Sequence, residues 1–203
     1  MEKSAKLGKL TLLNIILFGF IGQVAWAVEN NFFNTFLFSF GGTTKDISTM
    51  VAASAVVAVV TTFVMGTLSD KLGRRKVFIC AGYVAWGITV MAFAFISREN
   101  LGKLIGADPS SAAALSATVT TVIVMDCIMT FMGSTSNDSA FNAWITDVTV
   151  PSNRAKTEGL LAILPVLALV IVTGVFGFIA GDDAQASDYA TCFLGLGILV
   201  IIC

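Results

Sequence analysis

Long apolar stretches separated by short polar segments constrain the fold of this chain more than any other feature. A helix that crosses a membrane needs about 20 mostly apolar residues. On that criterion the chain has six spans, near residues 11–40, 47–69, 77–97, 111–145, 158–180 and 189–203. These runs are continuously apolar, whereas strands of membrane barrels alternate over about ten residues. The sequence therefore predicts an all-α membrane protein with six transmembrane helices, in one domain over residues 1–203.

The composition supports this prediction and excludes several classes of function. Hydrophobic residues make up 56% of the chain, charged residues 12%, and the mean hydropathy is +0.88, which together indicate an integral membrane protein whose main partner is the lipid bilayer. A net charge of -1 gives no general attraction to nucleic acid. The chain has no histidine, and its four cysteines lack C-x-x-C spacing, so we expect no metal site, no cofactor and no enzyme activity.

Two features at the ends of the chain affect the number of spans. The segment 189–203 has only fifteen residues, so we expect the chain to be truncated within its sixth span. At the other end, the basic start, the apolar run Leu10–Gly22 and the small-residue pattern Ala25-Trp26-Ala27 also fit a cleavable signal peptide. Against this alternative, the apolar character continues to Phe40, which favours one long span.

The distribution of lysine and arginine predicts the orientation in the membrane. Cytoplasmic loops carry an excess of these residues. The loops on one side contain Lys3, Lys6, Lys9, Lys71, Arg74, Arg75, Lys76, Arg154 and Lys156, and those on the other side contain Lys45, Arg98 and Lys103. The outer loops also hold acids, among them Asp182 and Asp183. We therefore expect a multi-pass protein of the cell membrane with a cytoplasmic amino terminus.

The polar segment between the second and third spans has a specific residue pattern. Gly66 allows a neighbouring helix to approach closely, and Gly73 suits a tight turn with positive φ. Asp70 can pair with Arg74 or Arg75. An ordinary basic loop accounts for the cations but not for the two glycines and the acid at these spacings.

This pattern resembles the loop between helices 2 and 3 of the major facilitator superfamily, G-x-x-x-D-x-x-G-R-(K/R). A second segment, with Asp147, Pro151, Arg154 and Gly159, is similar to the loop between helices 4 and 5 of that family. The resemblance implies the amino-terminal half of such a transporter, built as two inverted three-helix repeats, with a carboxy-terminal six-helix half as its missing partner. It also implies a conformational latch, which would hold the two halves together on the cytoplasmic side in one transport state. Its residues are Gly66, Asp70, Gly73, Arg74, Arg75, Asp147 and Arg154.

Carboxylates within the spans are the first candidates for function, because charged groups at membrane depth are costly and tend to face a cavity. Glu29, Asp126 and Asp138 qualify, and Asp126 lies deepest. At 100° per residue the fourth span presents one polar stripe of Asp126, Thr130, Gly133, Asn137 and Trp144. The first span presents Gln23, Asn30 and Asn34 on one face, with Trp26 at its edge and Glu29 nearer to Trp26 than to Gln23. In the family, helices 1 and 4 both line the central cavity.

From these stripes we predict a binding site and a coupling site. The substrate-binding residues are Gln23, Trp26, Asn30, Asn34, Asn137 and Trp144, and the cation-coupling residues are Asp126 and Glu29, with H⁺ or Na⁺ as the coupling ion. The alternative is that polar side chains only bond helices to one another. This alternative is preferred for Gln23, Asn137, Asp138 and both tryptophans.

The predicted function is secondary active transport of a small polar solute, with a sugar as a candidate, by ion-coupled alternating access. The sugar follows from a narrower resemblance, since Trp26–Asn31 and the charged loop are similar to symporters of the melibiose-permease type. Those permeases place paired acids on helix 2, and residues 48–68 contain none. Two alternatives remain open: a drug exporter, and a half-size membrane interaction subunit or truncated gene product. The reading frame after codon 203 would separate the last from a transporter.

Overall fold

The computed structural model describes residues 7–179 and 186–203, and within these ranges the regular structure is entirely helical. Lys3, Lys6, Asp182 and Asp183, which entered the predicted orientation, lie outside the described residues. The elements are α1 (Lys9–Ser39), α2 (Thr44–Leu72), α3 (Arg75–Ala92), a 3₁₀ turn (Phe93–Phe95), α4 (Arg98–Ile105), α5 (Ala112–Gly133), a π-helical segment (Ser134–Phe141), α6 (Asn142–Val148), α7 (Pro151–Leu161), α8 (Leu164–Ile179) and α9 (Ala186–Ile202).

Five helical stretches in the described ranges are long and apolar enough to cross a membrane. They are Lys9–Ser39, Thr44–Leu72, Arg75–Phe95, Ala112–Val148 and Pro151–Ile179, and they correspond to the first five predicted spans. α9 is apolar, but its 17 residues are fewer than the about 20 that a membrane span needs. The multi-pass membrane character therefore agrees with the structure, whereas the sixth span and the division into two repeats stay predictions.

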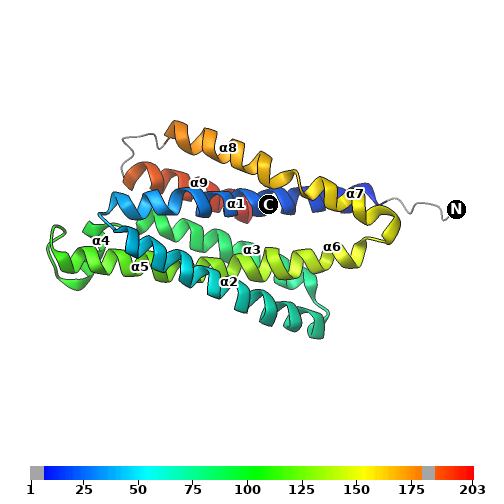
Figure 1. The fold of residues 1–203 in the computed structure, drawn as a ribbon, viewed down its shortest axis with the longest axis horizontal. Coiled ribbons are helices and arrows are strands. Elements are labelled where there is room, and N and C mark those ends of the chain that lie inside the picture. Colours follow the sequence, from blue (N-terminus) through cyan, green and yellow to red (C-terminus); the bar gives the residue numbers. More distant parts are fainter. Residues whose placement is uncertain (1–6, 180–185) are drawn as a thin grey trace.

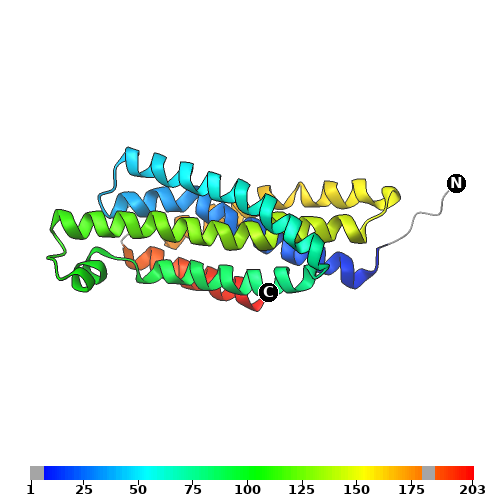
Figure 2. The same ribbon diagram turned by 90° about the horizontal axis from the view of Figure 1, so that it is seen from below.

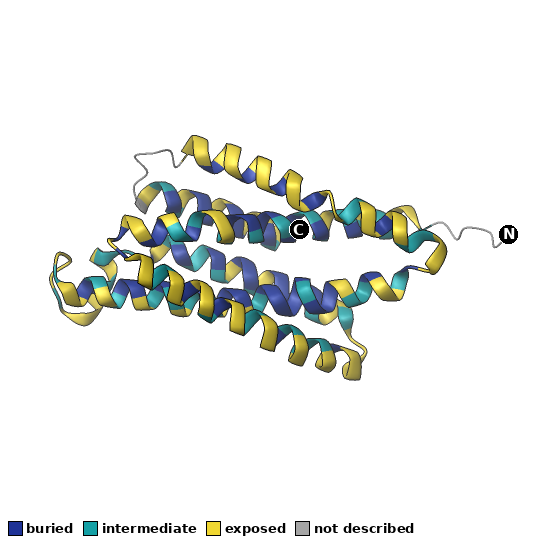
Figure 3. Cartoon of the chain, viewed as in Figure 1, coloured by how far each residue is buried: buried dark blue, intermediate teal, exposed yellow. Residues whose placement is uncertain are grey.

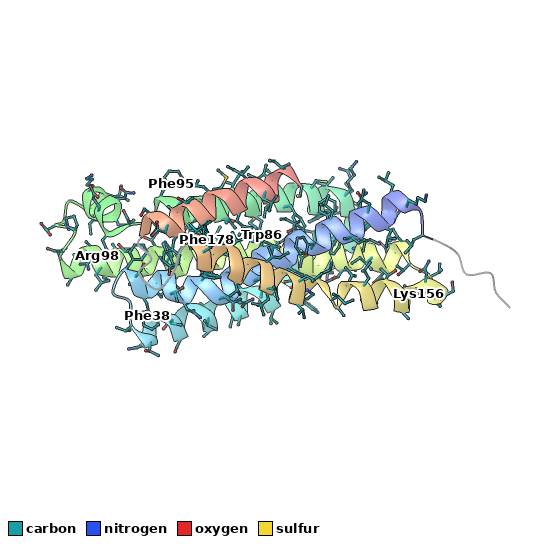
Figure 4. All side chains as sticks on the ribbon, turned by 90° about the horizontal axis from the view of Figure 1, so that it is seen from above. Phe38, Trp86, Phe95, Arg98, Lys156 and Phe178 are labelled. Carbon is teal, nitrogen blue, oxygen red and sulfur yellow. The ribbon has the colours of Figure 1, made fainter. Side chains whose placement is uncertain are left out.

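The helices lie side by side along the long axis of the molecule (Figures 1 and 2). α1 packs against α8, α3 against α9, and α2 against α5 and the π-helical segment. The start of α1 and the α2–α3 and α6–α7 connections lie at one end of the bundle, and α4 lies at the other (Figure 1). Lys156 and Arg98, labelled in Figure 4, mark these two ends. The two groups of basic residues that the sequence analysis assigned to opposite sides thus lie at opposite ends of the bundle. Which end faces the cytoplasm stays a prediction.

An aromatic cluster forms the core near the α4 end of the bundle. Phe33 of α1 lies 4.4 Å from Phe93 and 5.3 Å from Phe193, measured between ring centroids. Phe36 adds an edge contact with Phe193 at 5.0 Å. All four rings are buried, and between helices in lipid such side chains contribute through close van der Waals packing. The cluster therefore fixes α1, the end of α3 and α9 against one another.

The outward faces of the long helices are apolar. Figure 3 shows exposed residues along the outer sides of α2 and α8 and buried residues toward the middle of the bundle. Phe63 on α2 is 78% exposed and Phe178 on α8 is 91% exposed. Contiguous exposed apolar surface of this kind is typical of contact with lipid or with another protein.

Two details of the helices have clear local causes. The break between α7 and α8 falls at Ala162 and Ile163, because Pro165 has no N–H to donate to Leu161 and its ring clashes with that carbonyl. The short helix α4, absent from the predicted spans, begins at the cap residue Ser97, whose hydroxyl accepts from Asn100 N at 3.1 Å, and ends at Gly106 with φ +69°.

Candidate functional site

A polar cavity of about 430 Å³ lies between α1, α2, α5 and the π-helical segment. α1 supplies Gln23, Trp26, Glu29 and Asn30, α2 supplies Ser54, α5 supplies Thr130, and the π-helical segment supplies Asp138. The α1 residues share a face because they are spaced by three and four along a regular helix. Polar side chains from four segments therefore converge within a bundle that is otherwise apolar.

Glu29 is the central acid of this cavity. Thr130 Oγ1 donates to Glu29 Oε1 at 3.2 Å, which links α1 to α5. The second carboxylate oxygen, Oε2, is buried and accepts no hydrogen bond from the described residues. The charged groups that act on Glu29 most strongly are Asp126 and Asp138, both acids. Glu29 thus lines the cavity, and one of its two oxygens is buried without a donor in residues 7–179 and 186–203.

Asp126 lies behind the cavity, not on its wall. Its side chain is 2% exposed, and its Oδ1 accepts no hydrogen bond from the described part of the chain. Ser54 of α2 faces the carboxylate. Asp126 therefore has less accessible surface than Glu29, and it is separated from the open volume.

Asp138 lines the cavity although the sequence favoured a packing role for it. Ser134 Oγ donates to its Oδ2 at 3.0 Å, and Asn137 Nδ2 donates to its Oδ1 at 3.1 Å. The indole N–H of Trp26 also faces this carboxylate. These donors offset part of the cost of burying the charge. The polar run Ser134–Ser139 within an apolar span was the sequence signal for this part of the site.

The π-helical segment corrects the predicted stripe on the fourth span. Each residue of a π-helix turns less than the 100° of an α-helix, because its hydrogen bonds run from i to i+5. Of the stripe residues before this segment, Thr130 lines the cavity, and the face that the helix presents to the cavity changes after Gly133. Asp138 therefore reaches the cavity, while Asn137 and Trp144 do not line it.

Asn137 connects helices instead of lining the cavity. It is 4% exposed, and its Oδ1 accepts from Tyr83 Oη at 2.8 Å. A methyl group on Gly22 would come within 2.3 Å of the same oxygen, so α1 approaches Asn137 closely only because residue 22 is glycine. The packing alternative fits this contact between α1, α3 and the π-helical segment.

Two other predicted ligands also lie away from the polar cavity. Trp144 packs on Phe141, with ring centroids 6.0 Å apart, and lines a second cavity of about 340 Å³ with Lys76. Asn34 is half-buried and makes no hydrogen bond with the described residues. The structure thus brings together Gln23, Trp26, Glu29 and Asn30 but leaves Asn34, Asn137 and Trp144 outside the group.

The ring of Trp26 is held in place by close packing. Its centroid lies 5.0 Å from that of Trp86, and Trp86 is fully buried. A Cβ on Gly133 would lie 2.9 Å from Trp86 and 3.0 Å from Trp26, so glycine leaves the room that both rings need. Trp26 is therefore a fixed aromatic wall of the cavity.

A second polar group, the charged cluster of Asp70, Arg75 and Asp147, lies at the opposite end of the bundle from α4. Arg75 forms ion pairs with Asp70 at the end of α2 and with Asp147 in α6, the latter with Nε 2.9 Å from Oδ2. Arg75 Nη1 also donates to Ser69 Oγ at 2.8 Å. One guanidinium thus ties α2, α3 and α6 together.

The other residues of the predicted latch have separate roles. Gly73 ends α2 with φ +61°, which confirms the predicted tight turn. A Cβ on Gly66 would meet Ser139 at 3.7 Å, an ordinary contact, so the structure does not require glycine there. Arg154 donates to Thr146 O at 3.0 Å and so caps α6. Arg74 is exposed and makes no ion pair within the described residues.

Comparison with known proteins identifies the family but gives no individual relative. The family model described as Major Facilitator Superfamily matches residues 13–203. No curated protein matches the chain, and no solved structure does.

Proposed function

The chain belongs to the Major Facilitator Superfamily, whose members are membrane transporters, and we propose that it serves secondary active transport of a small polar solute by alternating access. The chain would supply one six-helix half, and a carboxy-terminal half would be its partner. A sugar is one candidate solute. The membrane would be the cell membrane, with the charged cluster on the cytoplasmic side.

The observation that carries this proposal is the polar cavity of about 430 Å³. Gln23 and Asn30 offer amide donors and acceptors that match the hydroxyl groups of a polar solute. Trp26 offers a flat apolar surface beside them. Apolar walls with a few convergent polar groups are typical of sites for small molecules.

Coupling to a cation follows from the carboxylates. Glu29 and Asp126 lie close together with unpartnered oxygens, and the charged groups nearest to Glu29 are acids. Adjacent carboxylates in a poorly hydrated site cannot all stay ionised without a counter-charge. Binding of H⁺ or Na⁺ would supply it, so occupancy by the ion would change the charge of the cavity during transport.

The charged cluster supplies a reversible contact for alternating access. Arg75 is 19% exposed, whereas Asp70 and Asp147 are 61% and 53% exposed. Ion pairs at this level of exposure are weak, about 0–1 kcal/mol, so they can form and break during a transport cycle. The cluster would stabilise one of two states of similar energy.

Uptake into proteoliposomes tests the function. The chain is reconstituted together with the carboxy-terminal six-helix half and supplied with labelled glycosides and amines under an inward gradient of H⁺ or Na⁺. We expect gradient-driven uptake that Asp126→Asn abolishes, because the amide cannot take up a proton or balance a cation. Glu158→Gln, which neutralises an exposed acid on α7, should leave uptake unchanged. Undiminished coupled uptake by Asp126→Asn would contradict the coupling role, and uptake no higher than in empty liposomes would contradict the function.

A further inference from the structure

The charged side chains around the polar cavity are all acidic among the described residues. Glu29 and Asp138 line it from α1 and the π-helical segment, and Asp126 lies behind Glu29. No lysine or arginine is among the described residues that line the cavity. A neutral solute would bond to the amides but would leave the two lining carboxylates without a counter-charge.

Glu29 shows where a positive donor would bind. Thr130 satisfies its Oε1, whereas its buried Oε2 has no partner in the described chain. A buried carboxylate oxygen without a donor is costly, and the cost is greater than for a neutral acceptor. An N–H group that carries positive charge would satisfy both the hydrogen bond and the charge.

Trp26 places an aromatic face beside these acids. Its ring lines the same cavity, and its N–H faces Asp138, which fixes the orientation of the indole. The face of a tryptophan ring attracts cations, by about 0.5–2 kcal/mol according to desolvation. Two carboxylates and an indole ring therefore line one open volume, and these are groups that accept from an organic ammonium group.

We propose that the solute carried by this transporter bears a protonated amine. The inference rests on the proposed transport function and names the class of its substrate. The ammonium group donates to Glu29 Oε2 and lies over Trp26, with Asp138 completing the counter-charge. Asp126, which does not line the cavity, then keeps the coupling role. The amides of Gln23 and Asn30 bond to the polar remainder of the solute.

Binding of matched probes to the purified full chain in nanodiscs tests this proposal by calorimetry. Phenethylammonium and 2-phenylethanol have the same shape and differ in charge, and phenylacetate provides the anion. We expect phenethylammonium to bind at least about tenfold more tightly than the alcohol, and phenylacetate not to bind. This comparison uses the natural sequence, so it does not depend on the folding of any variant.

Two variants then locate the site. Glu29→Gln should weaken phenethylammonium binding at least about tenfold and leave 2-phenylethanol binding nearly unchanged, because only the charge is lost. Glu158→Gln is the control with the same change of charge outside the cavity. Equal affinity for the amine and the alcohol, no binding of the amine, or binding of methyl galactoside in preference to the amine would overturn the proposal. Those results would leave the proposed transport function standing, since uptake is measured separately.

Discussion

Arg75 donates from Nε to Asp147 Oδ2 at 2.9 Å, and this contact joins residues 72 positions apart in the chain. Asp70, which lies five residues before Arg75, completes the charged cluster through the same guanidinium. The two polar segments that the sequence analysis treated as separate motifs therefore meet in a single interaction.

Arg75→Gln tests the importance of this contact. The change removes both ion pairs, and we expect the free energy of unfolding to fall by only about 1 kcal/mol, because both acids are largely exposed. Transport should fall more than stability does, since the cluster favours one conformational state. Thermal unfolding in detergent and uptake into proteoliposomes measure the two effects. Arg74→Gln is the matched control, and equal losses in the two variants would contradict a specific role for Arg75.

Gly73→Ala tests the turn between α2 and α3. Alanine in the left-handed region costs about 1–2 kcal/mol, so the midpoint of thermal unfolding should fall. Gly66→Ala should have no such effect, because the added methyl meets Ser139 at ordinary contact distance. A larger loss of stability for Gly66→Ala than for Gly73→Ala would contradict this account of the loop.

Gly22→Ala tests the close approach of α1 to the π-helical segment. The added methyl would lie 2.3 Å from Asn137 Oδ1 and 2.8 Å from Tyr83 Oη, and overpacking of this kind costs about 1–3 kcal/mol. Gly174→Ala on α8 is the control, since no atom of another described helix lies within 4 Å of its added Cβ. Thermal unfolding should show a loss for the first variant only. A stability of Gly22→Ala equal to that of the natural sequence would mean that the helices separate readily there.

The loop around α4 has its own dependence on pH. A hydrogen bond from Lys103, at 2.8 Å, lowers the pKa of Glu99 from 4.5, and hydrogen bonds from Ser110 lower the pKa of Asp108 from 3.8. Depressed folded pKa values mean that these contacts stabilise the loop above the unfolded pKa values and are lost as the pH falls through the folded ones. Titration of the side-chain carboxyl NMR signals should give midpoints below 4.5 and 3.8. Lys103→Met should return the midpoint of Glu99 toward 4.5 and leave that of Asp108 unchanged.

The long helices could be predicted from the sequence because their apolar runs reach the length of about 20 residues that a membrane span needs. α4 could not be found in that way, since it is short and charged, although Ser97 and Gly106 are ordinary signals of a helix start and end. Pro165 lies inside the fifth span, and the structure has a break in the helix just before it.

The candidate site was predictable where the helix is regular and not where it is distorted. α1 keeps its period through Asn30, so Gln23, Trp26 and Glu29 share the cavity as expected. The fourth span changes its period at Ser134, and no single residue type in this segment predicts a π-helical turn. The position of Asp138 in the cavity could therefore not be predicted from the sequence.

The π-helical segment also sets how the fourth span will respond to mutation along its length. In a systematic leucine scan from Ala112 to Val148, tolerated and damaging positions should alternate with a period of about 3.6 residues up to Gly133. From Ser134 to Phe141 the period should lengthen, and from Asn142 onward the period of about 3.6 residues should resume out of phase. A one-residue deletion between Ser134 and Asn137 would move Asp138 into the position of Asn137, so that Asp138 would face Tyr83 of α3 instead of the cavity.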